Sequence, residues 1–214
     1  LIILLLAGAW LFSRSRLPVT DGEIACPRLS AKATVTRDRW GVPHIAAANG
    51  RDAYFAYGFT VAQDRLFQMD LQRRLARGEL SEIIGKSMLE YDRLFRTLLF
   101  RRTAEKELAR AGSVHPEAMV LFDAFLDGVN HFIATQKLPV EFSILGAKPR
   151  PFTRVDCASI LGYLAFSFST GLKSDPLVSE LKQKKMDRDI LELFPGYTRE
   201  RPVTIMETQA AFTG

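Results

Sequence analysis

The sequence predicts an α+β fold that is mainly helical, with one short β hairpin near the N-terminus. Residues 33–45 (ATVTRDRWGVPHI) hold two β-branched runs separated by Asp38 and Gly41, a pattern typical of a strand, a turn and a second strand. From Asp52 onward, apolar residues recur at three- and four-residue steps, the period of amphipathic helices. With 214 residues, 47% of them hydrophobic and 25% charged, the chain can bury one good-sized core.

The hairpin and the first helix follow from local signals. Pro43 has no backbone N–H to donate, so we expect the second strand to lie at an edge or to begin at this proline. Asp38, between two arginines, is expected to be a turn residue. The first helix is predicted over residues 52–77, and Gly78 ends it. Its apolar face consists of Phe55, Phe59, Ala62, Leu66 and Met69.

Two further helices follow in the middle of the chain. One is predicted from about Leu89 to Ala111, where Gly112 stops it, and the next begins with Pro116 at its first helical position. The apolar stripe of this second helix consists of Leu121, Phe122, Phe125, Val129, Phe132 and Ile133. Stripes of this spacing are typical of core packing, so we assign them no ligand.

The C-terminal third begins with a connection and ends with a linker. Three prolines and a glycine in residues 139–152 predict an ordered connection without regular structure. Asp156 is predicted to cap an apolar helix that is interrupted near Gly171 and Pro176, and a last helix covers roughly residues 177–194. The polar stretch that follows, residues 197–214, is predicted to be a linker.

The N-terminal residues predict contact with a membrane. Residues 1–12 (LIILLLAGAWLF) are apolar without a break and precede Arg14 and Arg16, which indicates an export signal or a membrane anchor over residues 1–20. The run is shorter than the roughly 20 residues of a full span. A cleaved signal, a retained anchor and a buried core helix all remain open, and the first two predict a periplasmic or inner-membrane-anchored protein.

Charge argues against a nucleic-acid-binding surface. The formal net charge is +5, but basic and acidic residues are interleaved, which predicts a mixed solvated face. The members of this face are Arg73, Arg74, Arg77, Arg101 and Arg102 with Asp64, Asp70, Glu79, Glu82, Glu105 and Glu107. Asp64 with Arg65 is expected to form a helix-surface or intrahelical pair.

Taken alone, the residues predict no active site. His44, His115 and His131 lack metal-ligand spacing and are interpreted as structural, with a backbone carbonyl as the expected partner of His44. The sequence has no Cys-x-x-Cys, no phosphate-binding loop and no Gly-x-Ser-x-Gly elbow. Cys26 and Cys157 pair in an oxidising compartment or remain two buried thiols.

Four stretches nevertheless resemble the penicillin acylase family in their order and spacing. They are residues 35–45 (VTRDRWGVPHI), 52–70, 73–85 (RRLARGELSEIIG) and 141–152 (EFSILGAKPRPF). The resemblance implies the α-subunit portion of an N-terminal-nucleophile hydrolase, whose full fold has αββα layers, with an acylase α-subunit domain over residues 21–196.

The resemblance also implies where the chemistry resides. Members of this family are made as one precursor that cuts itself into α and β subunits. The new β N-terminus is a Ser whose own α-amino group, with an unperturbed pKa near 8, acts as its base. The oxyanion stabilisers come from the β subunit as well. No catalytic residue is therefore expected in this chain, and alone it is expected to be inactive.

The α subunit is expected to contribute part of the acyl pocket. By the register of the resemblance, Ala165, Phe166, Phe168 and Ser169 line or back this pocket. The two phenylalanines, two residues apart on a helix, do not face the same side, so at least one of them is expected to be core.

The resemblance further implies a structural calcium ion. An ungapped step from Leu164 places Asp175 at the position of the ligand, where relatives have Glu, and Glu180 is the rival if there is an insertion. Carboxylate oxygens suit this hard cation. The Asp175–Pro176 step is expected to break the helix and turn the carboxylate outward. The alternative is that Asp175 only caps the next helix.

The implied function is hydrolysis of an N-acyl amide to a carboxylate and an amine, with Gly214 as the processing junction. The implied partners are the β subunit of the same precursor, a small N-acyl substrate and, through residues 1–20, a membrane, but no nucleic acid. The alternatives are an acyl-homoserine-lactone acylase used in quorum quenching and a non-catalytic, membrane-tethered binding protein that keeps the fold.

Overall fold

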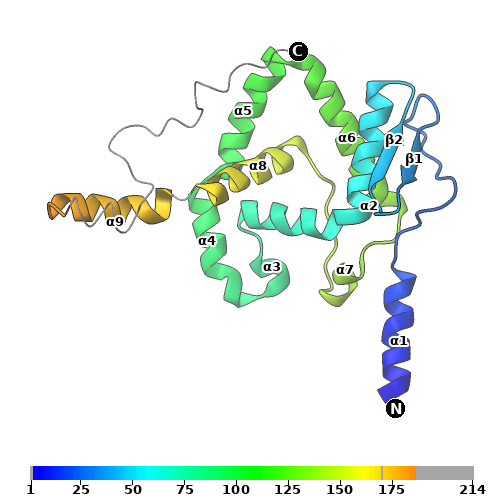
Figure 1. The fold of residues 1–214 in the computed structure, drawn as a ribbon, viewed down its shortest axis with the longest axis horizontal. Coiled ribbons are helices and arrows are strands. Elements are labelled where there is room, and N and C mark those ends of the chain that lie inside the picture. Colours follow the sequence, from blue (N-terminus) through cyan, green and yellow to red (C-terminus); the bar gives the residue numbers. More distant parts are fainter. Residues whose placement is uncertain (1, 170, 187–214) are drawn as a thin grey trace. The chain divides into compact units, whose positions relative to one another are not determined.

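The computed structural model describes residues 2–169 and 171–186. The chain divides into two compact units, residues 1–165 and 166–214. In the described part, the first unit is mainly helical and carries one two-stranded sheet, which confirms the predicted α+β character (Figure 1). The further layers of the expected αββα fold stay a prediction.

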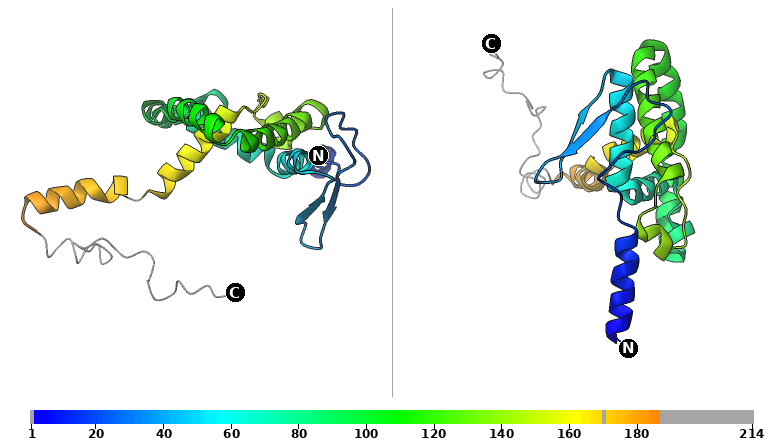
Figure 2. Two further views of the ribbon diagram at one scale, coloured as in Figure 1. Left: turned by 90° about the horizontal axis from the view of Figure 1, so that it is seen from above. Right: turned by 90° about the vertical axis from the view of Figure 1, so that its right-hand side faces the viewer.

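Two long helices form the centre of the first unit. Helix α2 (Gly50–Arg77) packs against α6 (Pro116–Thr135), as the two views of Figure 2 show. A Cβ atom added at Gly58 would lie 1.9 Å from the carbonyl oxygen of Phe125, and one at Gly128 would lie 2.0 Å from that of Phe55. The two backbones therefore touch, and only glycine allows this approach.

The core surrounds this crossing. Its buried members are Phe59, Ala62, Leu66, Leu126, Val129, Phe132, Phe142 and Phe152. The α2 and α6 residues among them lie on the apolar stripes predicted for these helices, or next to them, and Phe142 comes from the short helix α7 (Val140–Ile144) within the connection over residues 139–152. The core thus joins the central helix pair to the segment that leads to the next helix.

The hairpin forms as predicted. Strands β1 (Thr34–Arg37) and β2 (Pro43–Ala46) pair antiparallel, and Pro43 is the first residue of its strand. The carboxylate of Asp38 accepts hydrogen bonds from the backbone N–H groups of Trp40 and Val42, at 2.8 and 3.0 Å, and closes the turn.

A bidentate ion pair fixes the hairpin to α2. The guanidinium of Arg37 donates to both carboxylate oxygens of Asp64, at 2.8 and 3.0 Å. The prediction that Asp64 pairs with Arg65 is therefore wrong. Arg37 offers the planar fork that a carboxylate accepts in parallel, which an adjacent helical residue cannot present.

The helix ends in the middle of the chain agree only in part with the prediction. Helix α2 ends at Gly78, in the left-handed conformation, and is followed by α3 (Ser81–Ile84) and the 3-10 turn η1 (Lys86–Met88). The single helix predicted over residues 89–111 is two, α4 (Leu89–Thr97) and α5 (Phe100–Val114), because Leu99 adopts a positive φ of 55°.

Gly112 does not end α5. A single glycine within a helix costs about 1 kcal/mol relative to alanine but leaves the hydrogen-bond ladder intact. The helix continues to Val114, and His115 leaves the helical region because the residue before a proline disfavours it. Pro116 then starts α6, as predicted.

The last two helices also differ from expectation. Helix α8 (Arg154–Phe168) begins three residues earlier than predicted, and α9 (Gly171–Gln183) runs through Pro176, which was expected to break it. Proline removes one helical N–H but does not always end a helix. The predicted end of this helix, near residue 194, lies outside the described residues.

Helix α1 (Ile2–Ser15) carries the N-terminal apolar run. Its exposed large apolar side chains are Leu6, Trp10, Leu11 and Phe12, so the structure does not favour a buried core helix. Within the described residues, no helix is both long and apolar enough to cross a membrane. Export and anchoring stay predictions.

Candidate functional site

The helix predicted to support the acyl pocket, α8, begins with a reciprocal cap. The hydroxyl of Thr153 accepts from the backbone N–H of Asp156 at 3.2 Å, and the carboxylate of Asp156 accepts from the backbone N–H of Thr153 at 2.9 Å. Thr153 is thus the cap and Asp156 the third helical residue, which corrects the prediction that Asp156 is the cap. The sequence signal was a Thr three residues before an acidic residue.

Charged residues of α2 are buried beside this helix start. The side chain of Asp70 is 0% exposed and that of Arg73 1%, and Asp70 accepts from Arg73 and, at 2.8 Å, from Nε of Arg74. The prediction that these residues form a solvated face is wrong. Charged residues of opposite sign at a spacing of three or four occur both on solvent-exposed helix faces and in buried ion clusters, so the sequence pattern does not distinguish the two.

Arg73 connects α2 to the segment before α8. It donates to the backbone carbonyls of Arg150 and Pro151, at 2.9 and 3.2 Å, and its guanidinium lies 4.2 Å from the ring centre of Phe152. Its Nε atom is buried without a hydrogen-bond partner among the described residues. Four of the five guanidinium N–H groups can donate from the two terminal nitrogens, so most of the buried charge is satisfied.

Arg77 connects α2 to α8 itself. It donates to Asp156 at 2.9 Å and to Glu79 at 2.9 Å. Burial lowers the pKa of Arg77, but the hydrogen bond and charge of Glu79 and then those of Asp156 outweigh this effect and raise the pKa above its ordinary value. Arg77 therefore remains a cation throughout the physiological range.

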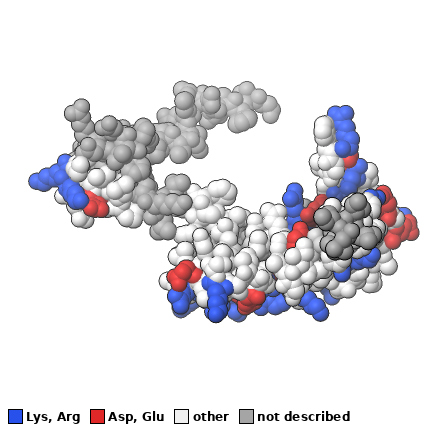
Figure 3. All heavy atoms as spheres, turned by 90° about the horizontal axis from the view of Figure 1, so that it is seen from below, with Lys and Arg blue, Asp and Glu red and all other residues white. Residues whose placement is uncertain are grey.

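On surfaces that the structure describes, charge is mixed. Figure 3 shows lysines and arginines beside aspartates and glutamates on one face, without a uniformly basic area in its described part. Exposed ion pairs of the described part include Arg154 with Asp123, and Arg101 with Glu105 at 3.0 Å. This face offers no stripe of the kind that binds phosphates.

The predicted pocket residues lie at the C-terminal end of α8 and just beyond it. Ala165 and Ser169 are exposed, and Phe168 is 81% exposed. Phe166 is partly buried, and its carbonyl accepts from the backbone N–H of Ser169 at 3.1 Å. Their role as a pocket wall stays a prediction.

The thiol of Cys157, in the first turns of α8, is held in its uncharged form. Burial, and then the charge of Asp156, raise its pKa to about 12, so it is uncharged at neutral pH. Burial also raises the pKa of Cys26. Both cysteines are free in the structure, which favours the unpaired alternative.

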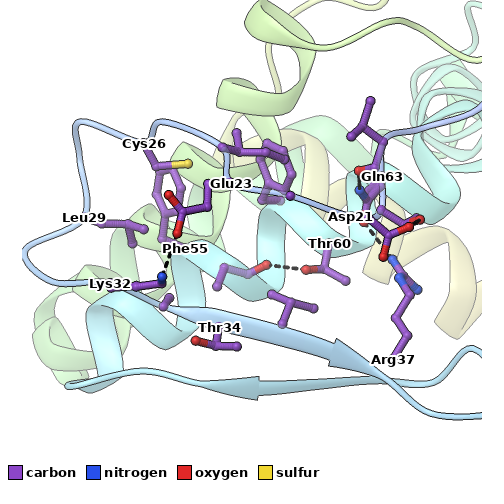
Figure 4. A pocket seen from close by; sticks show the side chains of 18 of the residues that line it. Asp21, Glu23, Cys26, Leu29, Lys32, Thr34, Arg37, Phe55, Thr60 and Gln63 are labelled. Atoms are coloured by element: carbon purple, nitrogen blue, oxygen red, sulfur yellow. Dashed lines mark hydrogen bonds and ion pairs between the residues drawn. The ribbon is translucent and has the colours of Figure 1, made fainter.

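A cavity of 660 Å³ lies between residues 19–35, β1 and the N-terminal half of α2 (Figure 4). Phe55 and Phe59 line it. Of its ionic groups, Lys32 and Glu23 pair with each other at 2.8 Å, and Arg37 pairs with Asp64. The Thr60 hydroxyl donates to a carbonyl of its own helix. Sequence reasoning missed this cavity because residues 19–33 have no periodic pattern, and the arrangement assembles neither a nucleophile with a base nor a metal-ligand set.

The calcium site stays a prediction. The side chain of Asp175 lies outside the described part of α9, and Gly214 lies outside the described residues. Glu180 is exposed and accepts from Lys184 at 2.7 Å, and the hydrogen bond and charge of Lys184 lower its pKa. Among the described residues no group of three or more His, Cys, Asp or Glu could hold a metal ion.

The rings of His44 and His131 have structural partners. His44 Nε2 lies 3.4 Å from the carboxylate of Asp38, not beside a backbone carbonyl as predicted, because the hairpin turn brings that carboxylate to it. His131 Nε2 lies 3.1 Å from the carbonyl of Ala25. His115 lies between α5 and α6.

Known structures identify the class of protein to which this arrangement of helices belongs. A solved chain of thermostable penicillin G acylase from Alcaligenes faecalis matches with a TM-score of 0.63 and 26% sequence identity, over 82% of this chain and 97% of that chain. A sequence model of the penicillin amidase family matches residues 32–204. The chain belongs to the penicillin amidase family.

Curated relatives include two kinds of acylase. Penicillin acylase 2 proenzyme of Pseudomonas sp. (strain SE83) is 42% identical over 140 residues, which is 65% of this chain and 18% of the relative. Acyl-homoserine lactone acylase QuiP of Pseudomonas aeruginosa is 32% identical over 201 residues, 91% of this chain and 23% of the relative. Penicillin G acylase of Escherichia coli is 32% identical over 165 residues, 72% and 19% respectively. The chain thus spans about a fifth of the length of these curated relatives.

Proposed function

We propose that this chain is the α-subunit part of a self-processing acylase that hydrolyses N-acyl amide bonds. The observation that carries the proposal is the family match over residues 32–204. The likeness to a solved acylase chain, almost the whole of which this chain covers, supports the division into subunits. A relative described as a proenzyme supports maturation from a precursor.

In the proposed reaction the β subunit supplies the chemistry and this chain supports the acyl group. A Ser hydroxyl at the β N-terminus attacks the amide carbonyl, and its α-amino group takes the proton and returns one to the leaving amine. Water then hydrolyses the acyl ester, releasing the carboxylic acid and restoring the serine. The end of α8, with Ala165, Phe166, Phe168 and Ser169, forms part of the wall around the acyl group.

A second candidate is hydrolysis of acyl-homoserine lactones, which would quench a signal by removing its acyl chain. The QuiP proteins favour it, because they align over more of this chain than the penicillin acylase 2 proenzyme does. The higher identity of that proenzyme favours the penicillin-type reaction. Both reactions break the same kind of bond and differ in the acyl and amine groups.

Expression of the complete gene product tests these candidates. Denaturing electrophoresis and N-terminal sequencing should find two fragments, the second beginning at or near the residue after Gly214. Release of free amine should then be measured with penicillin G and with short- and long-chain N-acyl-homoserine lactones. The control is alanine in place of the N-terminal residue of the second fragment, which should abolish activity. A single uncut polypeptide inactive on every substrate would favour the non-catalytic binding protein.

For the N-terminal segment the proposal is export to the periplasm or the inner membrane. The guanidinium groups of Arg14 and Arg16 lie 5.1 and 5.4 Å from the rings of Trp10 and Phe12, a combination of aromatic and basic residues suited to a membrane interface. Cell fractionation should find the protein outside the cytoplasm, and a variant lacking residues 1–16 inside it. Membrane and soluble periplasmic fractions distinguish an anchor from a cleaved signal.

A further inference from the structure

The start of α8 is fixed by directional contacts. One carboxylate oxygen of Asp156 accepts from Arg77, and the other accepts from both the backbone N–H and the hydroxyl of Thr153. The second oxygen also lies 4.0 Å from Arg73. The bonds from Thr153 hold the Asp156 carboxylate in one orientation at the start of α8, so α8 cannot shift along α2 or rotate about its own axis without breaking the bond from Arg77.

Apolar contacts along the rest of α8 are less specific. Tyr163 meets the ring of Phe95 edge-on at 5.5 Å, and a Cβ added at Gly162 would lie 3.3 Å from the Phe100 ring. Dispersion contacts of this kind depend on distance and tolerate small rotations. The hydrogen bonds at the N-terminal end therefore set the direction of α8, and the apolar contacts in its middle adapt to that direction.

A buried ion cluster is a costly way to hold a helix. Desolvation costs several kcal/mol for each ion, and apolar residues of similar size often stabilise a fold equally well. What the cluster provides in addition is a single geometry. That property matters where the far end of the helix must be placed accurately.

The predicted pocket residues lie at that far end. Ala165 follows Asp156 by nine residues, which is about 14 Å along a helix, so a tilt of about 5° at the start moves Ala165 by about 1 Å. Misplacement by 1 Å can change catalytic efficiency by about a hundredfold. The geometry at Asp156 is therefore transmitted to the acyl-binding end of the proposed enzyme.

We propose that Arg77 and Asp156 are positioning residues that hold α8 in place and thereby set which acyl chains the enzyme accepts. This inference rests on the proposed acylase function. Neither residue touches the acyl group, and both act through the direction of the helix.

The test compares acyl-chain preference in the processed full-length protein. The value of kcat/KM is measured for a short-chain and a long-chain N-acyl amide of one chromogenic amine, and the ratio of the two is formed. If a substitution only lowers the fraction of folded enzyme, both kcat/KM values fall by the same factor and their ratio is unchanged. Arg77→Gln and Asp156→Asn should change it by about tenfold, and Arg77→Lys, which retains a cation, by less.

The matched control is Arg154→Gln. It removes the exposed pair with Asp123 at the same helix start and should leave the ratio within about twofold of the wild type. An active enzyme whose ratio is unchanged in both Arg77→Gln and Asp156→Asn overturns the positioning role alone. A complete wild-type protein that cleaves no N-acyl amide overturns the proposed function, and the positioning role with it.

Discussion

The N-terminal half of α2 meets α6 through backbone contact at Gly58 and Gly128, whereas the C-terminal half of the same helix buries Asp70, Arg73 and Arg74. The first contact depends on the absence of side chains and the second on charges that satisfy one another. The difference shows that one helix can combine close apolar packing, which the sequence pattern reveals, with a buried charge cluster that the same pattern does not distinguish from a solvated face.

The largest effect is expected from breaking the buried charge cluster. Asp70→Leu leaves two buried guanidinium groups without their shared carboxylate, and we expect a loss of about 4 kcal/mol in the free energy of unfolding. Urea denaturation of the processed full-length protein measures it. The control is Asp123→Ala, which removes an exposed ion pair and should cost about 0.5 kcal/mol or less. Similar losses in both variants would contradict the distinction between them.

A smaller loss is expected from the glycine contact. Gly128→Ala places a methyl group against the carbonyl of Phe55 and forces α2 and α6 apart, at a cost of about 2–3 kcal/mol. Gly112→Ala is the matched control, because no atom lies within 4 Å of the added Cβ. It should raise the stability by about 0.5–1 kcal/mol, since alanine is the better helix former. Urea denaturation would count against close packing if both changes were stabilising.

The predicted calcium ligand Asp175 offers a third kind of contact, a carboxylate that binds a metal ion instead of an arginine. If Asp175 binds calcium, thermal melts of the processed heterodimer with calcium and with a chelator should differ, by about 2–3 kcal/mol at a hundredfold excess over Kd. Asp175→Ala should abolish the difference, and Glu180→Ala should preserve it. If only the second variant loses the calcium effect, Glu180 is the ligand. If neither variant does, the site lies elsewhere.

The smallest effect concerns Asp92 of α4, whose carboxylate caps the N-terminal end of α3. Asp92 accepts from the backbone N–H groups of Leu80 and Ser81, at 2.8 and 2.9 Å. Burial raises its pKa, but the hydrogen bonds from Ser81 and Leu80 and the charge of Arg96 outweigh this effect and hold the pKa below its ordinary value. Asp92→Ala should therefore cost about 1 kcal/mol at neutral pH.

The pH dependence tests this assignment. Because the folded pKa of Asp92 is depressed, its contribution is present above the ordinary pKa of about 4 and is lost as the pH falls through the lower folded value. The difference between wild type and Asp92→Ala should therefore shrink below about pH 4 in urea titrations. Glu90→Ala, on the exposed face of α4, is the control and should show little difference at any pH. A gap of the same size at pH 7 and at pH 2 would exclude the ionised carboxylate as its source.

The sequence predicted what depends on neighbouring residues. The helical period of the apolar residues, with Gly78 and Pro116 at helix ends, located α2 and α6, and Pro43 placed the start of β2. Each of these signals depends on only a few adjacent positions. The partner of Asp64 was missed because Arg37 lies 27 residues away. The break at Leu99 was missed because a positive φ at leucine leaves no signal in the residue type.

The candidate site was less predictable for the same reason. Burial of Arg77 depends on Asp156, 79 positions later, and local charge alternation does not reveal such a partner. Thr153 could have been found, since the spacing to Asp156 is that of a capping box. The pocket residues and Asp175 came from the family resemblance alone, because the spacing of these residues does not by itself indicate a pocket or a metal site.

The two tryptophans of this chain lie at its periphery, with Trp10 58% exposed on α1 and Trp40 76% exposed at the hairpin turn. Their intrinsic fluorescence should therefore have the long-wavelength emission of indole in water while the chain is folded. Unfolding of this part will change that emission little, so circular dichroism is the better probe of its helices. A shift toward shorter wavelength would instead report that a lipid bilayer has covered Trp10 or that another polypeptide has covered Trp40, which gives the chain a natural optical label at each of these two surfaces.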